Sequence, residues 1–331
     1  MRRRGLFFLD RHSIDAAFTL LPLAGCRRSV TSALDCRNGS NIVIDHKRNA
    51  DKSVPDDNRI TACASRRWQF DAQRRVDPGG SCRVWAGTCS DGSAAFLKWH
   101  PQRRSWRQEE QALRQWLPQI AQELANRPEL LDSSEQEGLL LISAVAGEPV
   151  ESGTDSEQEL HIIHRQTGVF LRELHRLEVV DEDPVALSKA MPERLQGWID
   201  KADGVLKDDQ IVQATKCIGD GSLFANDRRV ACHNDYQPRN WLWDGHRLGI
   251  IDFEHAHLNH PGFDLVRLQV GTWQESPSLR ESFLDGYGQY PDWLDDERMD
   301  AIITLFAIGC VVWGTQHHQE KLVELGRRCL A

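Results

Sequence analysis

The segment 233–254 constrains this chain more than any other, because two aspartates and an asparagine stand there at fixed distances from one another. It reads His-Asn-Asp-Tyr-Gln-Pro-Arg-Asn at one end and Ile-Ile-Asp-Phe-Glu at the other. The residues between, 241–251, alternate apolar runs with an Asp-Gly turn, which is typical of a short β-hairpin. The sequence therefore predicts that Asp235, Asn240 and Asp252 meet at the ends of one hairpin.

These three residue types suit phosphoryl transfer from a nucleotide. A carboxylate such as Asp235 can orient an attacking hydroxyl group and accept its proton. Asn240 and Asp252 offer hard oxygen ligands, which Mg²⁺ prefers when it also binds substrate phosphates. His-x-Asp alone is common by chance, but the asparagine, the hairpin and the second aspartate follow in order. We therefore predict Asp235 as the catalytic residue and Asn240 and Asp252 as metal ligands.

Other polar residues of this region have more than one interpretation. His233 is expected to fix the loop by hydrogen bonds from its ring, and a direct proton-transfer role is the alternative. Glu254 suits a second metal ion or the loop backbone, and equally a surface charge. Asp264 is expected to cap or anchor a helix. Three histidines follow the segment without a thiolate or further ligand at suitable spacing for zinc, so a structural role is expected. They are His255, His257 and His260.

An upstream lysine supplies a cation that nucleotide phosphates need. Lys98 ends an apolar run that, with residues 81–89 and a Ser-Asp-Gly turn, predicts a β-hairpin. There it would project into a cleft and contact phosphates, unless it is a solvated lysine on an edge strand. The next helix carries Glu109 and Glu110. We favour Glu109 as the partner of Lys98, because it precedes Leu113 by four residues on the inward side of the helix.

Two further segments are candidates for nucleotide binding. The apolar run 139–145 predicts a buried strand that leads into a hinge near residues 143–147, where Ser143 and Val145 are the predicted nucleotide-binding residues. Before the first hairpin, residues 77–81 read Asp-Pro-Gly-Gly-Ser. This segment could cover the phosphates with its backbone amides, although two glycines after a proline also suit a plain turn.

The pattern as a whole predicts an α+β fold of two lobes, like that of the protein kinases, with a small antiparallel sheet in the N-lobe and a larger helical C-lobe. We expect a poorly ordered extension over 1–62, an N-lobe with Lys98 over 63–145, and a C-lobe with the catalytic loop and acceptor site over 146–331. Order is expected to begin near Trp68. The predicted C-lobe helices are 157–177, 192–206, 277–287 and one long or two shorter helices over 296–330. The hairpin around 241–251 is the only strand-like material expected in the C-lobe.

Composition narrows the classes of partner. The formal net charge is −9, and because residues 1–60 hold 11 basic and 7 acidic residues, the rest of the chain is strongly acidic. An acidic body argues against nucleic acid as a partner and is compatible with a cationic acceptor. No apolar run reaches the roughly 18–20 residues of a membrane span, and the longest, 301–314, better suits a buried helix. The sequence does not predict an oligomeric state.

The cysteines and the N-terminal residues give information on the subcellular location of the protein. Nine cysteines without Cys-x-x-Cys or regular spacing indicate reduced thiols in a cytoplasmic protein. Residues 16–26 end in Leu-Ala-Gly-Cys, as a lipoprotein signal does, but charged residues interrupt the segment that precedes them. We therefore expect a cytoplasmic protein, where ATP is available as the phosphoryl donor.

From Trp68 to its end, the chain resembles the aminoglycoside phosphotransferase/choline kinase family, small-molecule kinases with a protein-kinase-like fold. The resemblance rests on Lys98, on Glu109 with Ala112–Leu117, on Leu139–Gly147, on Leu171-x-x-Leu174-His175, on His233-x-Asp235-x4-Asn240, on Ile251-Asp252-Phe-Glu254 and on Phe263-Asp264-Leu. It implies ATP, or GTP in some members, as donor, and the roles given above for Asp235, Asn240 and Asp252. This chain departs from the family at Asn234, where a glycine is usual, and a changed backbone angle is possible there.

The resemblance leaves the acceptor open among aminoglycosides, macrolides, amino alcohols and sugars. Trp273, Trp313 and His317 of the helical lobe are candidates for its pocket, although helix-spaced aromatics are usually core residues. A catalytically silent kinase-like protein that binds a nucleotide or a partner is the first alternative. A Ser/Thr protein kinase is the second, and the absence of an Ala-Pro-Glu motif and of a long activation segment after Asp252 disfavours it.

Overall fold

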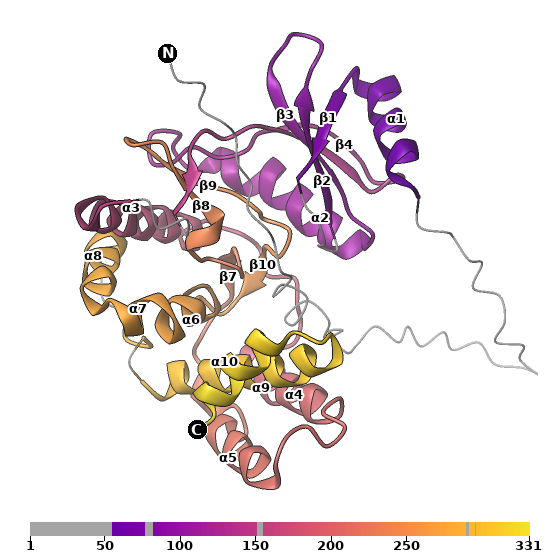
Figure 1. Cartoon of the computed structure of the whole chain (residues 1–331). Helices are drawn as coiled ribbons and strands as arrows, with labels where there is room; N and C mark the ends of the chain where they lie inside the picture. The colour runs from indigo at the N-terminus through magenta and orange to yellow at the C-terminus, as the bar shows by residue number, and fades with distance from the viewer. Residues whose placement is uncertain (1–54, 77–81, 151–154, 289–290, 295) are drawn as a thin grey trace, which may run out of the picture.

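The computed structural model describes residues 55–76, 82–150, 155–288, 291–294 and 296–331. Its described part has two lobes, a strand-rich one at the top of Figure 1 and a helical one below it. The expected α+β architecture, with a small antiparallel sheet above a larger helical lobe, is confirmed.

The N-lobe is one five-stranded antiparallel sheet with the strand order β1-β2-β3-β5-β4. Its helices and strands are α1 (Asp57–Trp68), β1 (Asp71–Arg75), β2 (Arg83–Thr88), β3 (Ala94–Trp99), α2 (Arg103–Gln111), β4 (Leu130–Ser134) and β5 (Leu139–Ser143). A π-helical turn, Ala112–Trp116, and a 3-10 turn, Leu117–Gln119, continue α2. The predicted hairpin is β2-β3, and the predicted buried strand is β5.

Strand β3 shows how the sheet separates its two faces. Side chains alternate along a strand, so Ala95, Leu97 and Trp99 share one face and pack with Ile60 and Ala64 of α1. Phe96 and Lys98 share the other face, on the side of α2 and the cleft between the lobes. Because Lys98 is only 3% exposed, the alternative of a solvated lysine on an edge strand is wrong.

The N-terminal boundary differs from the expected one. Helix α1 begins at Asp57, where the side chain of Asp56 accepts a hydrogen bond from the Arg59 amide and caps the first turn. Ile60 and Ala64 anchor it on the sheet, so a boundary after residue 62 would cut a packed helix. The two buried residues are spaced by one turn among polar neighbours, a weak signal that explains why order was expected only near Trp68.

The C-lobe consists mainly of helices. They are α3 (Glu157–His175), α4 (Leu187–Ile199), α5 (Asp208–Ile218), α6 (Gly262–Val270), α7 (Thr272–Glu275), α8 (Pro277–Tyr287), α9 (Glu297–Gln316) and α10 (Glu320–Cys329). Helices α3 and α8 match the predicted helices closely, and the segment 296–330 forms two helices. The helix expected from residue 192 begins at Leu187, so that Pro192 lies inside α4 rather than near its start.

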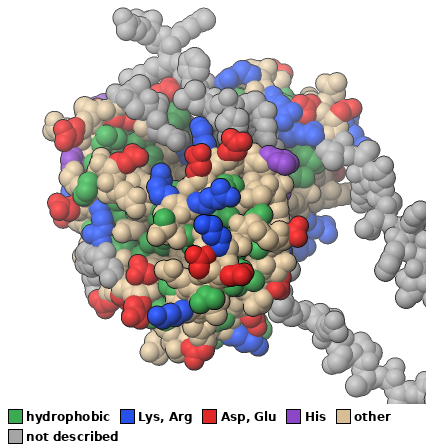
Figure 2. Space-filling view, turned by 60° about the horizontal axis from the view of Figure 1, so that its bottom comes forward, with side chains coloured by type: hydrophobic (Ala, Val, Ile, Leu, Met, Phe, Trp, Pro, Cys, Tyr) green, Lys and Arg blue, Asp and Glu red, His purple; other side chains and the backbone are tan. Residues whose placement is uncertain are grey.

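Helix α9 is long and apolar enough to cross a membrane by length and composition, yet 72% of its apolar window is buried inside the fold. Its residues from Ala301 to Gly314 are core residues, as the sequence predicts, and α4, α5, α6 and α10 surround it. Figure 2 shows one face of the molecule, on which acidic, basic and hydrophobic side chains are interspersed.

Five short strands of the C-lobe hold the catalytic segment. The predicted hairpin is β8 (Trp241–Trp243) and β9 (Leu248–Ile250), and β6 (Glu148–Pro149) pairs with β8. In addition, β7 (Val230–Cys232) pairs antiparallel with β10 (His257–Asn259). The expectation that the hairpin holds all the strands of this lobe is therefore wrong, because β7 and β10 are too short to show a period of two.

Candidate active site

The three residues predicted to carry the chemistry, Asp235, Asn240 and Asp252, lie at the ends of short strands. Asp235 follows β7, Asn240 ends a 3-10 turn (Pro238–Asn240) before β8, and Asp252 follows β9. The Ile251 amide donates to the Asn240 carbonyl oxygen at 3.1 Å, which continues the hairpin ladder beyond its strands. The structure thus brings the three residues together as the spacing predicts.

The carboxylate of Asp235 is 2% exposed and is surrounded by donors. Its Oδ2 accepts from Asn240 Nδ2 at 2.7 Å and from Arg239 Nη2 at 2.9 Å. Its Oδ1 lies 3.1 Å from Arg267 Nε and also accepts from Gln237 Nε2. A carboxylate has about four lone-pair positions, and these four donors use them. An acceptor hydroxyl must therefore replace or share one donor to reach Asp235.

Arginines hold Asp235 ionised. Burial alone would raise the pKa of this carboxyl, but the positive charges of Arg239 and Arg267, together with His255, outweigh it and lower the pKa to about 2. Such a group is a weak base at neutral pH. A carboxylate of this kind is suited to orienting a hydroxyl group, whose proton it can take as the oxygen loses its basicity.

Asp264 fixes the loop that carries Asp235. It is fully buried in α6 and accepts hydrogen bonds from the His233 amide at 3.0 Å and from the Asn234 amide. His175 Nε2 lies 3.0 Å from the same carboxylate. Asp264 was expected to cap or anchor a helix. It is an anchor, but it holds the loop that carries Asp235. His233 acts similarly, since its Nε2 lies 3.0 Å from the Ile251 carbonyl oxygen.

Asn234 adopts a left-handed backbone conformation, with φ of 62°. This explains why glycine is usual at the position, and asparagine is among the residues that tolerate such angles best. Its side chain lies inside the fold, where its Oδ1 accepts from Asn259 Nδ2 at 2.7 Å. The residue thus links the catalytic loop to strand β10. Asp252 also has positive φ, 70°, an unusual conformation that often marks a functional position.

Lys98 joins the two lobes. Its Nζ lies 2.6 Å from Glu109 Oε1 in α2 and 2.8 Å from Asp252 Oδ1 in the C-lobe. All three side chains are buried. Glu110 instead pairs with Arg114 on the surface of the same helix, so geometry selects Glu109 as the partner of the lysine. Burial lowers the pKa of Lys98 less than the two carboxylates raise it, so the ammonium is charged.

A pocket between the lobes lies beside Lys98 and Asp252. The predicted hinge residues line it: the hydroxyl of Ser143 is used by the Glu129 amide, at 2.9 Å, while Val145 packs against Gly249 of β9. Most of the other lining residues are apolar and come from both lobes; they are Val84, Phe96, Pro128, Ile142, Leu242 and Ile251. An apolar slot that ends in a lysine and a carboxylate suits a base followed by phosphates. The proposed phosphate-covering loop, residues 77–81, lies outside the described residues.

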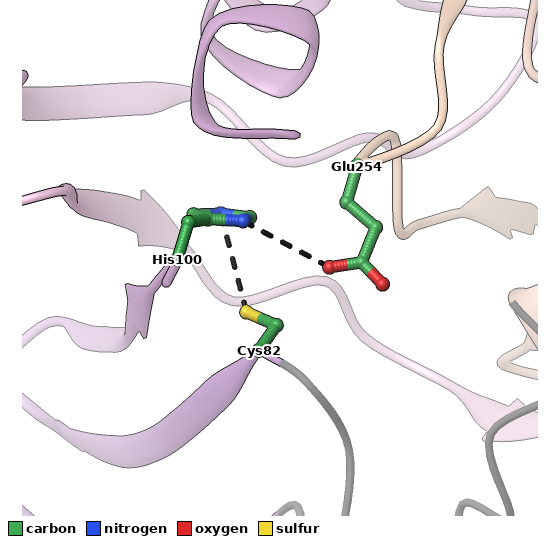
Figure 3. Close-up of side chains that lie close together, drawn as sticks. All are labelled: Cys82, His100 and Glu254. Carbon is green, nitrogen blue, oxygen red and sulfur yellow. Dashed lines mark hydrogen bonds and ion pairs between the residues drawn. The ribbon is translucent and has the colours of Figure 1, made fainter. Parts of the chain in front are cut away.

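Figure 3 shows a buried group of three side chains, Cys82, His100 and Glu254, of which the sequence analysis named only Glu254. His100 lies 4.0 Å from Cys82 Sγ and 3.9 Å from a Glu254 oxygen, and its Nε2 lies 3.0 Å from Glu109 Oε2. Burial raises the pKa of the Cys82 thiol well above its usual value, which disfavours the thiolate that a soft metal would need. Glu254 is 5% exposed, so its interpretation as a surface charge is wrong.

Of the candidate acceptor aromatics, the two tryptophans are core residues, whereas His317 is exposed. Trp273 and Trp313 are each 3% exposed in the main core, and Trp313 stacks on His317. The three histidines after the segment also have structural partners: His257 Nδ1 lies 2.8 Å from the His255 carbonyl oxygen, and His260 lies 3.2 Å from Asp227.

A second hollow borders the catalytic loop. Its polar lining consists of Arg194, Asn234, His257, Asn259 and Arg267, and it shares no lining residue with the pocket beside Lys98. Arg194 comes from α4 and Arg267 from α6. The sequence analysis named neither arginine, because no motif surrounds them. Arg239 stands inside the quoted motif, and its position four residues after Asp235 in a turn was the available signal.

Comparison with known proteins gives one family. A family model described as the phosphotransferase enzyme family, APH, matches residues 73–300. The resemblance stated from the motifs is thereby confirmed.

Solved structures share the fold over most of this chain. A streptomycin–ATP–APH(2″)-IIa ternary complex has a TM-score of 0.61 at 17% identity and covers 84% of this chain and 97% of its own. A GDP and kanamycin complex of APH(2″)-IIia has a TM-score of 0.63 at 14% identity and covers 82% of this chain and 97% of its own. The macrolide 2′-phosphotransferase MphH from Brachybacterium faecium has a TM-score of 0.55 at 16% identity and covers 83% of this chain and 97% of its own. At such identities the likeness shows the fold.

Proposed function

The chain belongs to the phosphotransferase enzyme family, and from this premise we propose that it transfers the γ-phosphate of ATP to a hydroxyl group of a small molecule. The observation that carries the proposal is the contact of Lys98 Nζ with Asp252 Oδ1 at 2.8 Å. It joins strand β3 of the N-lobe to the segment 233–254 of the C-lobe, beside the pocket between the lobes. The reaction needs ATP as donor, and we expect it to take place in the cytoplasm.

The residues present fit Mg²⁺. Asn240 uses its Nδ2 to bind Asp235, which leaves its carbonyl oxygen for a cation, and Asp252 supplies a buried carboxylate beside it. Oxygen ligands of this kind suit Mg²⁺ that also binds phosphates. When bound, the ion would neutralise charge on the transferring phosphoryl group. Lys98, held by Glu109, would contact the phosphates as a point charge.

Asp235 would align the acceptor. Its carboxylate would accept a hydrogen bond from the hydroxyl group, whose oxygen attacks the γ-phosphorus in line with the bond to the β-phosphate oxygen. As the new P–O bond forms, the old one breaks and ADP leaves, while the hydroxyl proton passes to Asp235. Because the pKa of Asp235 is lowered to about 2, this transfer comes late, after the oxygen has become acidic.

The test is an ATP-consumption screen over aminoglycosides, macrolides, amino alcohols, hydroxy acids and sugars, with wild type and Asp235→Asn. We expect turnover with at least one acceptor class and a loss of about 10²–10⁴-fold in the variant. Asp285→Asn is the matched control, because this exposed aspartate pairs only with Arg165 on the surface.

Two outcomes would contradict the proposal. Equal turnover by wild type and Asp235→Asn would remove the assigned role of that residue. Binding of Mg-ATP without transfer to any acceptor would favour a catalytically silent kinase-like protein, and label transfer from ATP into lysate proteins would favour a protein kinase.

A further inference from the structure

The charge around the second hollow differs from what an acidic protein leads one to expect. Arg239 and Arg267 both contact Asp235, and Arg194 lines the same hollow as Arg267. Two guanidinium groups therefore contact this one carboxylate, and a third, that of Arg194, lines the hollow beside it.

Arg194 is the least compensated of these cations. Its polar contacts are two long ones, at 3.4 and 3.5 Å, to Asn259 Oδ1, and its guanidinium lies over the Phe263 ring at 4.9 Å. Among the described residues no carboxylate lies within ion-pair distance of it. Arg194 is half-buried, and a partly desolvated charge without a counter-ion is costly unless a ligand supplies the opposite charge.

The surroundings hold Arg194 toward the hollow. Asn259 donates through Nδ2 to Asn234 Oδ1 at 2.7 Å, which turns its own Oδ1 to the arginine. Burial and the positive charges of Arg229 and Arg104 lower the pKa of Arg194 to about 10, against a smaller opposing effect of Asp183, so Arg194 is still charged at neutral pH. Arg104 lies in the first turn of helix α2 of the N-lobe.

We propose that the acceptor of phosphoryl transfer is an anion, a hydroxy compound whose carboxylate or phosphate group binds Arg194 while its hydroxyl group lies at Asp235. Guanidinium binds both groups through two parallel hydrogen bonds, which fixes orientation as well as charge. The inference rests on the proposed function and specifies its substrate class. It replaces the cationic acceptor that the net charge suggested.

Arg267 gives the proposal a structural consequence. It contacts Asp235 and lines the hollow, so an anion bound there competes with Asp235 for its guanidinium. If Arg267 turns to the anion, it vacates a position on Asp235 Oδ1 that the acceptor hydroxyl can take. A neutral or cationic acceptor offers no such exchange, and the positive charges of Arg194 and Arg267 would repel a polyamine.

The experiment compares matched acceptors that differ only in charge. They are glycerol, glycerate and glycerol 3-phosphate; glucose, gluconate and glucose 6-phosphate; and choline and kanamycin as cations. We expect kcat/KM to be at least tenfold higher for the carboxylate or the phosphate member than for the neutral member of one series. The anion with the higher kcat/KM shows whether the site recognises a carboxylate or a phosphate group. Preference for a neutral or cationic member would overturn the proposal.

Variants tie the preference to Arg194. Arg194→Gln should raise KM for the preferred anion at least tenfold and abolish the preference, with KM for ATP within twofold of wild type. Arg194→Lys keeps the positive charge but cannot donate two parallel hydrogen bonds, so it should restore part of the preference for the anion. Arg165→Gln is the control, because its exposed pair with Asp285 lies on α3 and α8. An unchanged preference in Arg194→Gln would also overturn the proposal.

A binding measurement separates this inference from the proposed function. With the protein saturated with Mg-ADP, glycerate and glycerol 3-phosphate are titrated against tryptophan fluorescence in wild type, Arg194→Gln and Arg165→Gln. Binding that needs Arg194, without transfer to any acceptor, would support the anion site and remove the proposed function. Transfer to a neutral acceptor with no binding of either anion would leave the function and remove the anion site.

Discussion

The two sides of Asp235 carry opposite charge. On the nucleotide side, Glu109, Asp252 and Glu254 are three buried carboxylates around Lys98, an arrangement that favours a divalent cation. On the other side, the cations are arginines and Asp235 is the carboxylate among them. These charges would favour a divalent cation on one side of Asp235 and an anion on the other. Asp235, between them, remains ionised because of the second group.

The nucleotide side should show the largest effect of a single substitution. Asp252→Asn removes a negative charge that both Lys98 and the expected Mg²⁺ need, so we predict a loss of kcat/KM of about a thousandfold. Asp285→Asn, on the exposed surface, should keep full activity. Steady-state kinetics at several Mg²⁺ concentrations measure the effect, and full activity of Asp252→Asn would show that this carboxylate holds no metal.

The two adjacent glutamates of α2 allow a matched comparison. Glu109→Gln weakens the hold on Lys98, so KM for ATP should rise about tenfold, as expected for a charge-assisted contact worth roughly 1.5–3 kcal/mol. Glu110→Gln breaks only the pair with Arg114 and should change KM for ATP less than twofold. The reverse order of the two variants would assign the lysine partner to Glu110.

The arginine side should be sensitive to pH. Asp235 acts ionised, so activity is present above its pKa and lost as pH falls through it, and a pKa of about 2 keeps that loss outside the usual assay range. Arg267→Gln removes one stabilising charge, so the pKa of Asp235 should rise and the acid limb of kcat/KM should move upward. A pH profile of kcat/KM with the same acid limb in both proteins would contradict the account of Asp235.

The smallest effect concerns stability on the arginine side. Burial lowers the pKa of His257 to about 3 from an ordinary value of 6.5. The folded state therefore resists protonation that the unfolded chain accepts, so stability falls as pH drops from about 6.5 toward 3, by at most about 1.4 kcal/mol per pH unit for this group. His257→Gln should flatten the decline of the urea midpoint below pH 6.5. An equally steep decline in the variant would show that other groups cause it.

The sequence predicts one side of the site better than the other, for a physical reason. Asn240 and Asp252 flank one hairpin and Asp235 lies five residues before Asn240, so local spacing sets their positions. Lys98 lies on strand β3, whose apolar residues can be recognised as a strand from the sequence. Arg194 and Arg267 instead reach the site from two helices, and only the packing of α4 and α6 decides where their side chains point. No local pattern carries that information.

The fold shows the same division between local and distant information. Helix α8 begins with a proline and has a clear apolar face, and its bounds match the predicted ones. Strand β1, in contrast, is polar and mostly exposed at the sheet edge, so it has no apolar alternation to detect. Strands β7 and β10 have three residues each, and 24 residues separate their ends in the chain. Their pairing is decided by tertiary contacts.

The most direct test of the account is a crossed measurement of two Michaelis constants, with the best acceptor from the matched series. Lys98→Met acts on the nucleotide side and Arg194→Gln on the arginine side. The account predicts that Lys98→Met raises KM for ATP at least tenfold and leaves KM for the acceptor within twofold, and that Arg194→Gln does the reverse. If both variants change the same constant, the two sides of Asp235 do not serve different substrates.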